Sequence, residues 1–352
     1  MISFLQILLY ILGGTLIFVS LLPLIRNDYW TFRVFEFPRA QKWVINFILL
    51  VASIILFPSD AYFSFGFIIL LFANQLYLSY QIYPYLPIAK KQIASVRHDK
   101  EPSIKLLIAN VYQDNRQWDK LAKMVKDEQA DIVLLVETNK WWKDKCCAAF
   151  GEEYPYQVLE DRENTYGMLL FSKLELKNTQ IHYWIKEEIP SIETDIQLEN
   201  RSIKFYAIHP EPPVPSENTK STERDAEILL IGQKTKADQM PTIVAGDLND
   251  VAWSYTSELF LKTSGLLDPR RGRGFFSSFH AKYPLFRWPL DHVFCSGHFR
   301  LQKMKRMESI GSDHFPILLQ LHLAKTDDDS NELEVTKEDK ELTKEKIENG
   351  LD

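Results

Sequence analysis

The chain of 352 residues carries a formal net charge of −6 and exceeds the usual size of one domain, so we expect more than one structural unit. Residues 104–324 hold 28 basic and 31 acidic side chains. This balance argues against a protein that holds long nucleic acid mainly by phosphate neutralisation, although a local basic groove stays open. Cys146, Cys147 and Cys295 are too few and too badly placed for a disulfide framework, and no Cys/His spacing typical of zinc sites occurs.

The first 25 residues contain no charged side chain. The run Ile2–Ile25 is long enough, at about 1.5 Å per residue, to cross a hydrocarbon core about 30 Å thick. It lacks the basic start and the small-residue end of a cleaved signal peptide. It is therefore a candidate membrane span.

Two further apolar runs follow the first. Trp43–Phe57 is marginal alone, but residues 58–60 read Pro-Ser-Asp, which predicts a turn into the uncharged run Ala61–Tyr83. We expect a transmembrane hairpin, with Tyr and Trp at the edges of the spans as interface anchors. The alternative is the helical core of a soluble domain, which two uncharged runs of this length disfavour.

Basic residues flank these spans asymmetrically. They lie between spans one and two and after span three, and are absent between spans two and three: Arg26, Arg33, Arg39, Lys42, Lys90, Lys91, Arg97 and Lys100. The positive-inside bias then puts the domain after span three on the cytoplasmic side. This inference depends on an odd number of spans, and so on Trp43–Phe57 crossing the bilayer.

We divide the chain into a membrane region (1–89), a linker (90–103), a folded domain (104–323) and a tail (324–352). The tail is polar, acidic and free of aromatic residues. We expect it to be disordered, because it offers too little apolar surface to bury.

Short apolar runs typical of strands alternate with amphipathic stretches in the folded domain. The expected strands are Ile104–Tyr112, Asp131–Thr138, Tyr166–Ser172, Ile192–Leu198, Ile203–His209, Thr242–Leu248, His292–Cys295 and Phe315–Leu321. One helix is expected between the first two strands, where Trp118, Leu121 and Val125 share a face, and another from about Ser221 to Lys236. Many strands with few helices predict two packed sheets with helices outside.

Polar residues suited to catalysis stand where the expected strands end, the position at which a scaffold presents reactive groups to solvent. They are Asn110, Glu137, His209, Asp247, Asn249, Asp291, Asp313 and His314. Each has an ordinary alternative, because Asn, Asp and Glu cap turns and helices and a lone His is commonly packed in a core. Their coincidence at successive strand ends favours one shared site.

Four of these residues belong to two specific sequence motifs, GDLN at 246–249 and SDHFP at 312–316. Together with Asn110 and Glu137, in this order, they resemble the endonuclease/exonuclease/phosphatase superfamily over about Ile104–Leu323. The resemblance implies an α/β four-layer sandwich, in which two packed, mainly antiparallel β-sheets lie between helices and the active site lies at one edge. With the preceding transmembrane helices, the chain resembles a bacterial branch of the superfamily, which implies an integral protein of the bacterial plasma membrane.

A divalent cation would shield the phosphate from its nucleophile and neutralise the charge that develops on it. Glu137 is the expected first metal ligand. The resemblance implies that Asn110 lies near the metal and the phosphate, and that Asp313 is a further ligand or electrostatic contact. Mg²⁺ suits one or two carboxylates that leave it several waters, and Mn²⁺ is able to substitute for it.

Hydrolysis also needs an oriented water. Asp247 is the acid best placed to deprotonate it, and Asn249 is expected to donate its amide to a phosphate oxygen. His314 would contact the phosphoryl group while Asp291 fixes its tautomer, and His209 matches a phosphate-contacting position of the superfamily. Asp247 and the His–Asp pair stay open as alternative bases.

Arginines near these motifs are candidates for substrate binding, because a guanidinium forks onto phosphate. The candidates are Arg224, Arg273 and Arg287, with Arg270 and Arg271 beside them, and the alternative for each is a solvated surface role. Tyr112 stands where several nucleases of the superfamily have a polar metal-side residue, so a second metal contact there is not expected. Tyr166 and the two residues after it are expected to support the site structurally.

These features lead to a membrane-anchored, metal-dependent hydrolase of a phosphodiester or phosphomonoester. A lipid or head-group phosphate is the preferred substrate, because the spans hold the site near the bilayer and raise the effective concentration of lipid. A metal-dependent nuclease is the alternative. A non-catalytic phosphate-binding domain is a third hypothesis, which the full set of core residues disfavours, and no protein partner is inferred.

Overall fold

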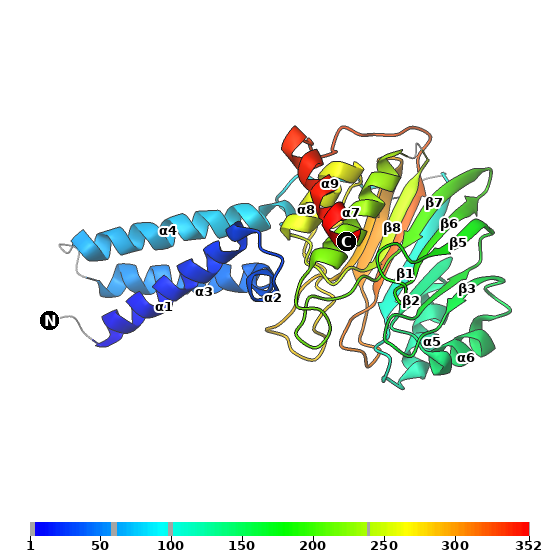
Figure 1. Cartoon of the computed structure of the whole chain (residues 1–352), viewed down its shortest axis with the longest axis horizontal. Coiled ribbons are helices and arrows are strands. Elements are labelled where there is room, and N and C mark those ends of the chain that lie inside the picture. The colour runs from blue at the N-terminus through cyan, green and yellow to red at the C-terminus, as the bar shows by residue number, and fades with distance from the viewer. Residues whose placement is uncertain (1–3, 58–61, 98–100, 238–239, 352) are drawn as a thin grey trace.

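Three long helices project side by side from one end of a body built on two β-sheets (Figure 1). This computed structural model describes residues 4–57, 62–97, 101–237 and 240–351. The helices are α1 (Phe4–Leu21), α3 (Arg39–Leu56) and α4 (Tyr62–Ile82). With their flanking 3-10 turns, all three are long and apolar enough to cross a membrane. The turn expected at residues 58–60 lies outside the described residues.

Side-chain amides and a small residue hold the three helices together. Asn46 of α3 donates to Oε1 of Gln75 (2.8 Å), and Asn74 of α4 donates to Oδ1 of Asn46 (2.8 Å). Gly13 allows α1 to approach α4, since a Cβ at this position would lie 2.6 Å from the ring of Phe67. The bundle thus has polar contacts inside and exposed large apolar side chains outside.

A short connecting segment, residues 26–38, joins α1 to α3 and docks on the body. The segment follows the 3-10 turn η1 (Leu22–Ile25) and contains α2 (Trp30–Arg33) and η2 (Val34–Glu36). A further 3-10 turn, η3 (Tyr83–Tyr85), follows α4. The Trp30 backbone N–H donates to the Thr219 carbonyl (2.8 Å), and the Trp253 indole donates to the Glu36 carbonyl (2.9 Å). The segment is therefore tied to the body at both of its ends.

The body contains a six-stranded sheet, in the order β10-β11-β1-β2-β4-β3, and a five-stranded sheet, in the order β5-β6-β7-β8-β9. The strands are β1 (Ser103–Asn110), β2 (Ile132–Val136), β3 (Tyr156–Glu160), β4 (Met168–Ser172), β5 (Leu176–His182), β6 (Ser191–Leu198), β7 (Arg201–Ala207), β8 (Thr242–Asp247), β9 (Asp291–Cys295), β10 (Phe299–Arg306) and β11 (Ile317–Leu323). Two neighbouring pairs, β1 with β2 and β7 with β8, are parallel. The other paired strands are antiparallel.

Helices cover both outer faces of the two sheets, while apolar side chains such as Ile108, Leu134 and Val293 fill the space between the sheets. The six-stranded sheet is covered by α5 (Trp118–Glu128) and α6 (Lys140–Phe150), and the five-stranded sheet by α7 (Thr222–Ala237), α8 (Tyr255–Ser264) and α9 (Lys337–Leu351). This arrangement confirms the expected α/β four-layer sandwich with helices outside.

Two terminal parts of the body differ from expectation. Residues 93–96, within the expected linker, run beside β10, where the Val96 N–H donates to the Leu301 carbonyl (3.0 Å). In the tail, α9 packs on α7 and buries Ile347, and Lys346 Nζ lies 2.8 Å from Asp28 and 3.2 Å from Asp225. Disorder was the wrong expectation for residues 337–351, because a few apolar side chains and one buried cation are enough to dock this helix.

Candidate active site

The candidate residues meet because four strands end at the same edge of the sandwich. Asn110 is the last residue of β1 and Glu137 follows β2, which is parallel to β1. In the other sheet, His209 follows β7 and Asp247 ends its parallel neighbour β8. The antiparallel strand β9 begins beside Asp247 with Asp291. Carboxyl ends of parallel strands share an edge, and the sandwich brings the two edges together.

The Asn110 side chain links the two sheets at this edge. Its Nδ2 donates to Oε1 of Glu137 (2.7 Å) and to Oδ2 of Asp247 (2.9 Å). Its Oδ1 accepts from the Tyr112 backbone N–H (2.9 Å). Asn110 therefore holds the two carboxylates in place with its nitrogen, and its oxygen is engaged by backbone.

His314 lies between two carboxylates. Its Nδ1 is 2.8 Å from Oδ2 of Asp291, and its Nε2 is 3.5 Å from Oδ2 of Asp247. Burial by itself would lower the pKa of His314, but the charges of Asp247 and Asp291 outweigh it and raise the pKa to about 10. With this pKa the ring is an imidazolium at neutral pH. Both of its nitrogens then carry a proton, and each faces a carboxylate.

Asp247 organises the backbone around it. The His209 ring is held with Nδ1 3.0 Å from the Asp247 carbonyl, and the Asn249 N–H donates to Oδ1 of Asp247 (3.0 Å). The Asn249 amide donates one hydrogen to the Pro210 carbonyl (2.9 Å), which leaves its second hydrogen for another acceptor. Glu137 and Asn249 both have positive φ angles, 57° and 51°, and such backbone conformations cluster at functional sites.

The donor set fits a divalent cation. Partial burial of Glu137 and full burial of Asp247 raise the pKa of each carboxyl. Their ionised forms are therefore poorly stabilised by the surrounding protein, and a bound cation would stabilise them. Oδ1 of Asp291 is buried without a hydrogen-bond partner among the described residues. Ligand atoms of Asp247, Asp291 and His314 lie within 4.8 Å of one another. The carboxylate oxygens of this group suit a hard cation, whereas the protonated His314 is not a ligand. Glu137 and Asp313 line the pocket beside it.

A pocket of about 660 Å³ opens from this site. Four predicted residues line it: Glu137, Asn249, Asp313 and His314. The rest of its lining is mainly apolar and comes from three places, which are the connecting segment (Trp30, Arg33, Val34, Phe35, Phe37, Pro38), the loop after β7 (Pro212, Pro213, Val214, Pro215, Glu217) and the loop before β9 (Phe279, Phe286, Trp288, Leu290). The site residues thus sit in an apolar pocket that the helical region helps to build.

The predicted substrate-binding arginines are engaged elsewhere. Arg224 is buried against Asp225 and donates to the Asn249 carbonyl (2.7 Å), so it supports the site from behind. Arg273 donates to the Ile93 carbonyl (2.5 Å) and holds the linker. The remaining guanidiniums also have protein partners, since Arg287 contacts the carbonyls of 280 and 281, Arg270 pairs with Asp268 and Arg271 pairs with Glu258.

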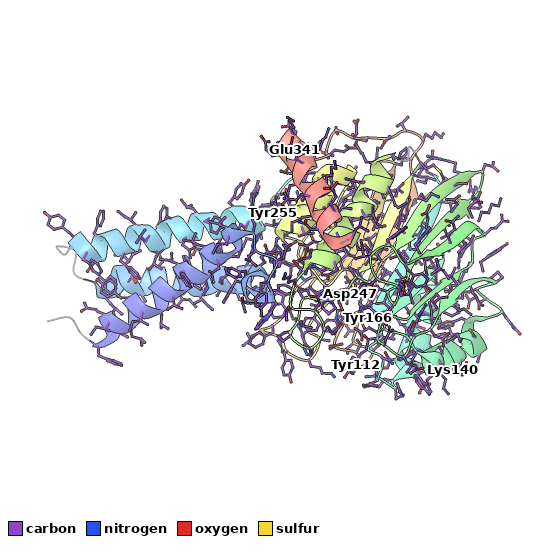
Figure 2. The ribbon with its side chains drawn as sticks, in the orientation of Figure 1. Tyr112, Lys140, Tyr166, Asp247, Tyr255 and Glu341 are labelled. Atoms are coloured by element: carbon purple, nitrogen blue, oxygen red, sulfur yellow. The ribbon has the colours of Figure 1, made fainter. Side chains whose placement is uncertain are left out.

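Tyr166 contacts one predicted site residue and one residue that the sequence did not indicate. Its ring lies 5.6 Å from that of His209, and its hydroxyl donates to Glu217 in the loop after β7. Tyr166 and Asp247 are both labelled on the body in Figure 2. Ser278 was also missed, although its hydroxyl accepts from the N–H groups of Leu290 (3.2 Å) and Asp291 (3.1 Å) and so fixes the start of β9.

A two-sheet sandwich whose strand ends bring carboxylates, an amide and a His–Asp pair to one pocket defines a class of proteins, the metal-dependent hydrolases of phosphoesters. Residues 107–314 match the Endonuclease/Exonuclease/phosphatase family. Because the match covers more than half of the chain, the chain belongs to this family. Its members are metal-dependent phosphoesterases, nucleases and phosphatases.

Solved structures share the fold at low sequence identity. An endonuclease/exonuclease/phosphatase from Beutenbergia cavernae DSM 12333 has a TM-score of 0.53 at 11% identity, over 64% of this chain and 72% of that one. TDP2 of D. rerio, solved with single strand DNA product, has a TM-score of 0.51 at 14% identity, over 64% and 100%. A family protein from Bacteroides thetaiotaomicron has a TM-score of 0.50 at 16% identity, over 65% and 98%. A sequence comparison with curated proteins found no match, and these likenesses concern the fold alone.

Proposed function

We propose that the chain is an integral membrane phosphoesterase that uses Mg²⁺, or Mn²⁺ in its place, to hydrolyse the phosphoester of a membrane lipid. The three apolar helices would anchor it in a bacterial plasma membrane with the body on the cytoplasmic side. The connecting segment follows the first span and the body follows the third, and the two are in contact. Their contact requires both to lie on one side, which agrees with three crossings. The positive-inside bias selects the cytoplasmic side.

The observation that carries the lipid proposal is the composition of the pocket. Its apolar lining includes residues of the connecting segment, which lies at the membrane end of the body. A site for long nucleic acid would instead present unpaired basic side chains along a groove. The predicted arginines are already paired with protein groups, so the pocket suits the apolar part of a lipid better than a polyanion.

The site residues supply the remaining chemistry. A bound divalent cation would polarise the phosphoryl group and neutralise its charge. Asp247, which is buried 3.5 Å from His314 Nε2, would accept a proton from the attacking water. The protonated Nε2 of His314 would donate to a phosphoryl oxygen while Asp291 holds the ring. Asn249, His209 and Asp313 would contact the phosphate or the cation, and Asn110 would keep Glu137 aligned.

A nuclease is the second candidate. It is supported by the fold that the chain shares with a TDP2 structure solved with single strand DNA product. Part of the apolar wall of the pocket comes from the connecting segment, which lies outside the matched residues 107–314. The shared fold therefore gives no support to a nuclease at that part of the pocket.

The test is a substrate panel assayed with purified full-length protein in lipid nanodiscs. Phospholipids, lipid-linked phosphates, inositol phosphates and single-stranded and double-stranded DNA would each be tested with Mg²⁺, with Mn²⁺ and with chelator. We expect metal-dependent release of a phosphorylated or dephosphorylated headgroup from a lipid, and loss of this activity in Glu137→Gln, which keeps the shape but not the charge. Activity confined to DNA would reject the lipid proposal and favour the nuclease.

A further inference from the structure

We infer that residues 281–288 form a membrane-contacting loop, here the interface loop, which lies in the bilayer surface and borders a lateral opening to the active site. The inference rests on the proposed function and adds the route by which substrate arrives. The substrate would be an amphiphile that moves from the leaflet into the pocket while its hydrophobic part stays in apolar surroundings. The occupant of the surface is therefore lipid.

The first observation is unusual exposure. Within the body, the described residues with the most exposed large apolar side chains are Leu285 (78%), Tyr283 (59%) and Phe286 (59%), all in the interface loop. Contiguous exposed apolar side chains mark contact surfaces for membranes or proteins. The other strongly exposed apolar residue of the body, Leu351 (57%), stands alone at the end of α9.

The second observation fixes the depth of the loop. Gln41 Nε2 donates to the carbonyls of Leu285 (3.0 Å) and Arg287 (3.4 Å). Gln41 is the third residue of α3, which is a candidate span from Arg39 to Leu56. With a rise of about 1.5 Å per residue, the loop tip lies level with the first turn of this span. The loop is therefore held where a span meets the membrane surface.

The third observation is an unbroken chain of rings from the loop to the catalytic histidine. Phe286 lies 6.2 Å from Trp288, Trp288 lies 6.0 Å from Phe279, and Phe279 lies 5.0 Å from His314. Phe37 of the connecting segment completes the wall, 5.6 Å from Trp288. Phe286, Trp288, Phe279 and Phe37 all line the pocket. An apolar chain can thus remain desolvated along the whole way from the leaflet to the phosphate-binding residues.

The loop is also built firmly enough to act as a fixed contact. The His280 N–H donates to the Phe286 carbonyl (2.9 Å), and the Ala281 N–H donates to the carbonyl of Asp313 (2.6 Å), the neighbour of His314. Lys282, exposed beside the apolar tip, is able to place its ammonium among anionic headgroups. The loop combines an apolar tip, a basic flank and a backbone tied to the site, which suits a lipid surface better than a protein partner.

The depth of the loop is measured with a fluorescent label. In a Cys147→Ser background, Leu285→Cys is labelled with an environment-sensitive dye, and Leu351→Cys serves as the matched control. The labelled proteins are reconstituted into phosphatidylcholine vesicles that contain nitroxide lipid labelled near the top of the acyl chain. We expect strong quenching and a blue shift at position 285 and neither at position 351. Equal signals at the two positions would overturn the inference.

A second measurement separates the route from the chemistry. Leu285 does not line the pocket, so Leu285→Asp should leave the rate on a short-chain, water-soluble phosphoester within about twofold of wild type. On lipid in vesicles, its rate should fall by about tenfold, the order expected from losing one buried leucine contact. Leu351→Asp should match wild type in both assays. An equal fall on both substrates, or none on either, would overturn the inference.

The two proposals fail in different ways. If position 285 is quenched but no lipid phosphoester is hydrolysed, the loop contacts the membrane and the proposed substrate class is wrong, so the route to a lipid substrate falls with it. If lipid is hydrolysed while position 285 is not quenched, the proposed function stands and the lateral route is rejected.

Discussion

At the scale of single residues, the side chains of the site form hydrogen bonds and ion pairs with one another. Asn110 aligns two carboxylates, Asp291 fixes His314, and Asp247 faces both groups. The sequence predicted these residues because each lies at or near one end of a strand, and strand ends are visible in the pattern of apolar runs. It did not predict that the arginines would be buried in other contacts, since an arginine that supports a fold looks the same in sequence as one that binds phosphate.

The His314–Asp291 pair should behave as one unit. We expect His314→Ala and Asp291→Asn each to lower turnover by several orders of magnitude, because an imidazole that faces phosphate needs its carboxylate to stay protonated and oriented. The double mutant should be little worse than the poorer single mutant. Single-turnover rates of the three variants check this. Additive losses would mean that Asp291 acts separately, for example through its unpartnered Oδ1.

Glu227 is a buried carboxyl outside the pocket that should make stability depend on pH. Burial raises its pKa from 4.5 to about 7, against the hydrogen bond from Ser191 and the charge of His209. A raised folded-state pKa gives stability that is present below pH 4.5 and is lost as the pH rises towards and through 7, by about 3 kcal/mol at most. We expect the melting temperature of Glu227→Gln in detergent to change less between pH 5 and 8 than that of the wild type. A profile as steep as that of wild type would assign the pH dependence to another group.

At the scale of elements, three strands escaped prediction for one physical reason. β3, β5 and β10 are the first or last strands of their sheets, a position at which polar residues are tolerated. Their sequences, such as LKNTQIH in β5, lack the apolar runs that mark the interior strands. The interior strands and the fully buried edge strand β9 consist mainly of apolar residues and were therefore predictable, as was the order of the site residues beside them. The three polar edge strands were not.

The connecting segment is an element whose importance the sequence did not reveal. Its residues read as an ordinary basic loop, yet Arg33 is buried between Glu36 (3.3 Å) and Asp225 (3.4 Å). Burial raises the pKa of Glu36 in spite of the charge of Arg33. A contact between residues nearly 200 positions apart leaves no local signal, so only the folded structure shows that this loop is part of the pocket wall.

Removing one member of this ion pair should cost more than removing both. Arg33→Met leaves the Glu36 carboxylate buried without a partner, and breaking a buried pair costs on the order of 3–5 kcal/mol. We expect a lower melting temperature and faster proteolysis of residues 26–38 in detergent. Adding Glu36→Gln should restore part of the loss. If the two substitutions are additive instead, the pair is not coupled and Arg33 acts through Thr256.

At the scale of the whole molecule, the body has its own core between the two sheets. We therefore expect a variant lacking residues 1–100 to fold, with native circular dichroism and limited proteolysis under reducing, metal-containing conditions. It should bind more hydrophobic dye than the full chain, because the pocket loses the wall formed by the connecting segment. A truncated chain that lacks secondary structure would show instead that the membrane region belongs to the folding unit.

The shared wall of the pocket also has a kinetic consequence. On the proposed function, a site whose wall is fixed to helices that span the bilayer would stay at the membrane, so its encounters with a lipid substrate would take place in two dimensions. The rate should then follow the mole fraction of substrate in the leaflet, and inert lipid added at constant bulk concentration should dilute it. After cleavage of the proposed lipid substrate, the water-soluble fragment would depart, while the apolar fragment would stay in the leaflet beside the proposed opening. Product inhibition should therefore come from the fragment that remains in the membrane and grow as the surface is consumed.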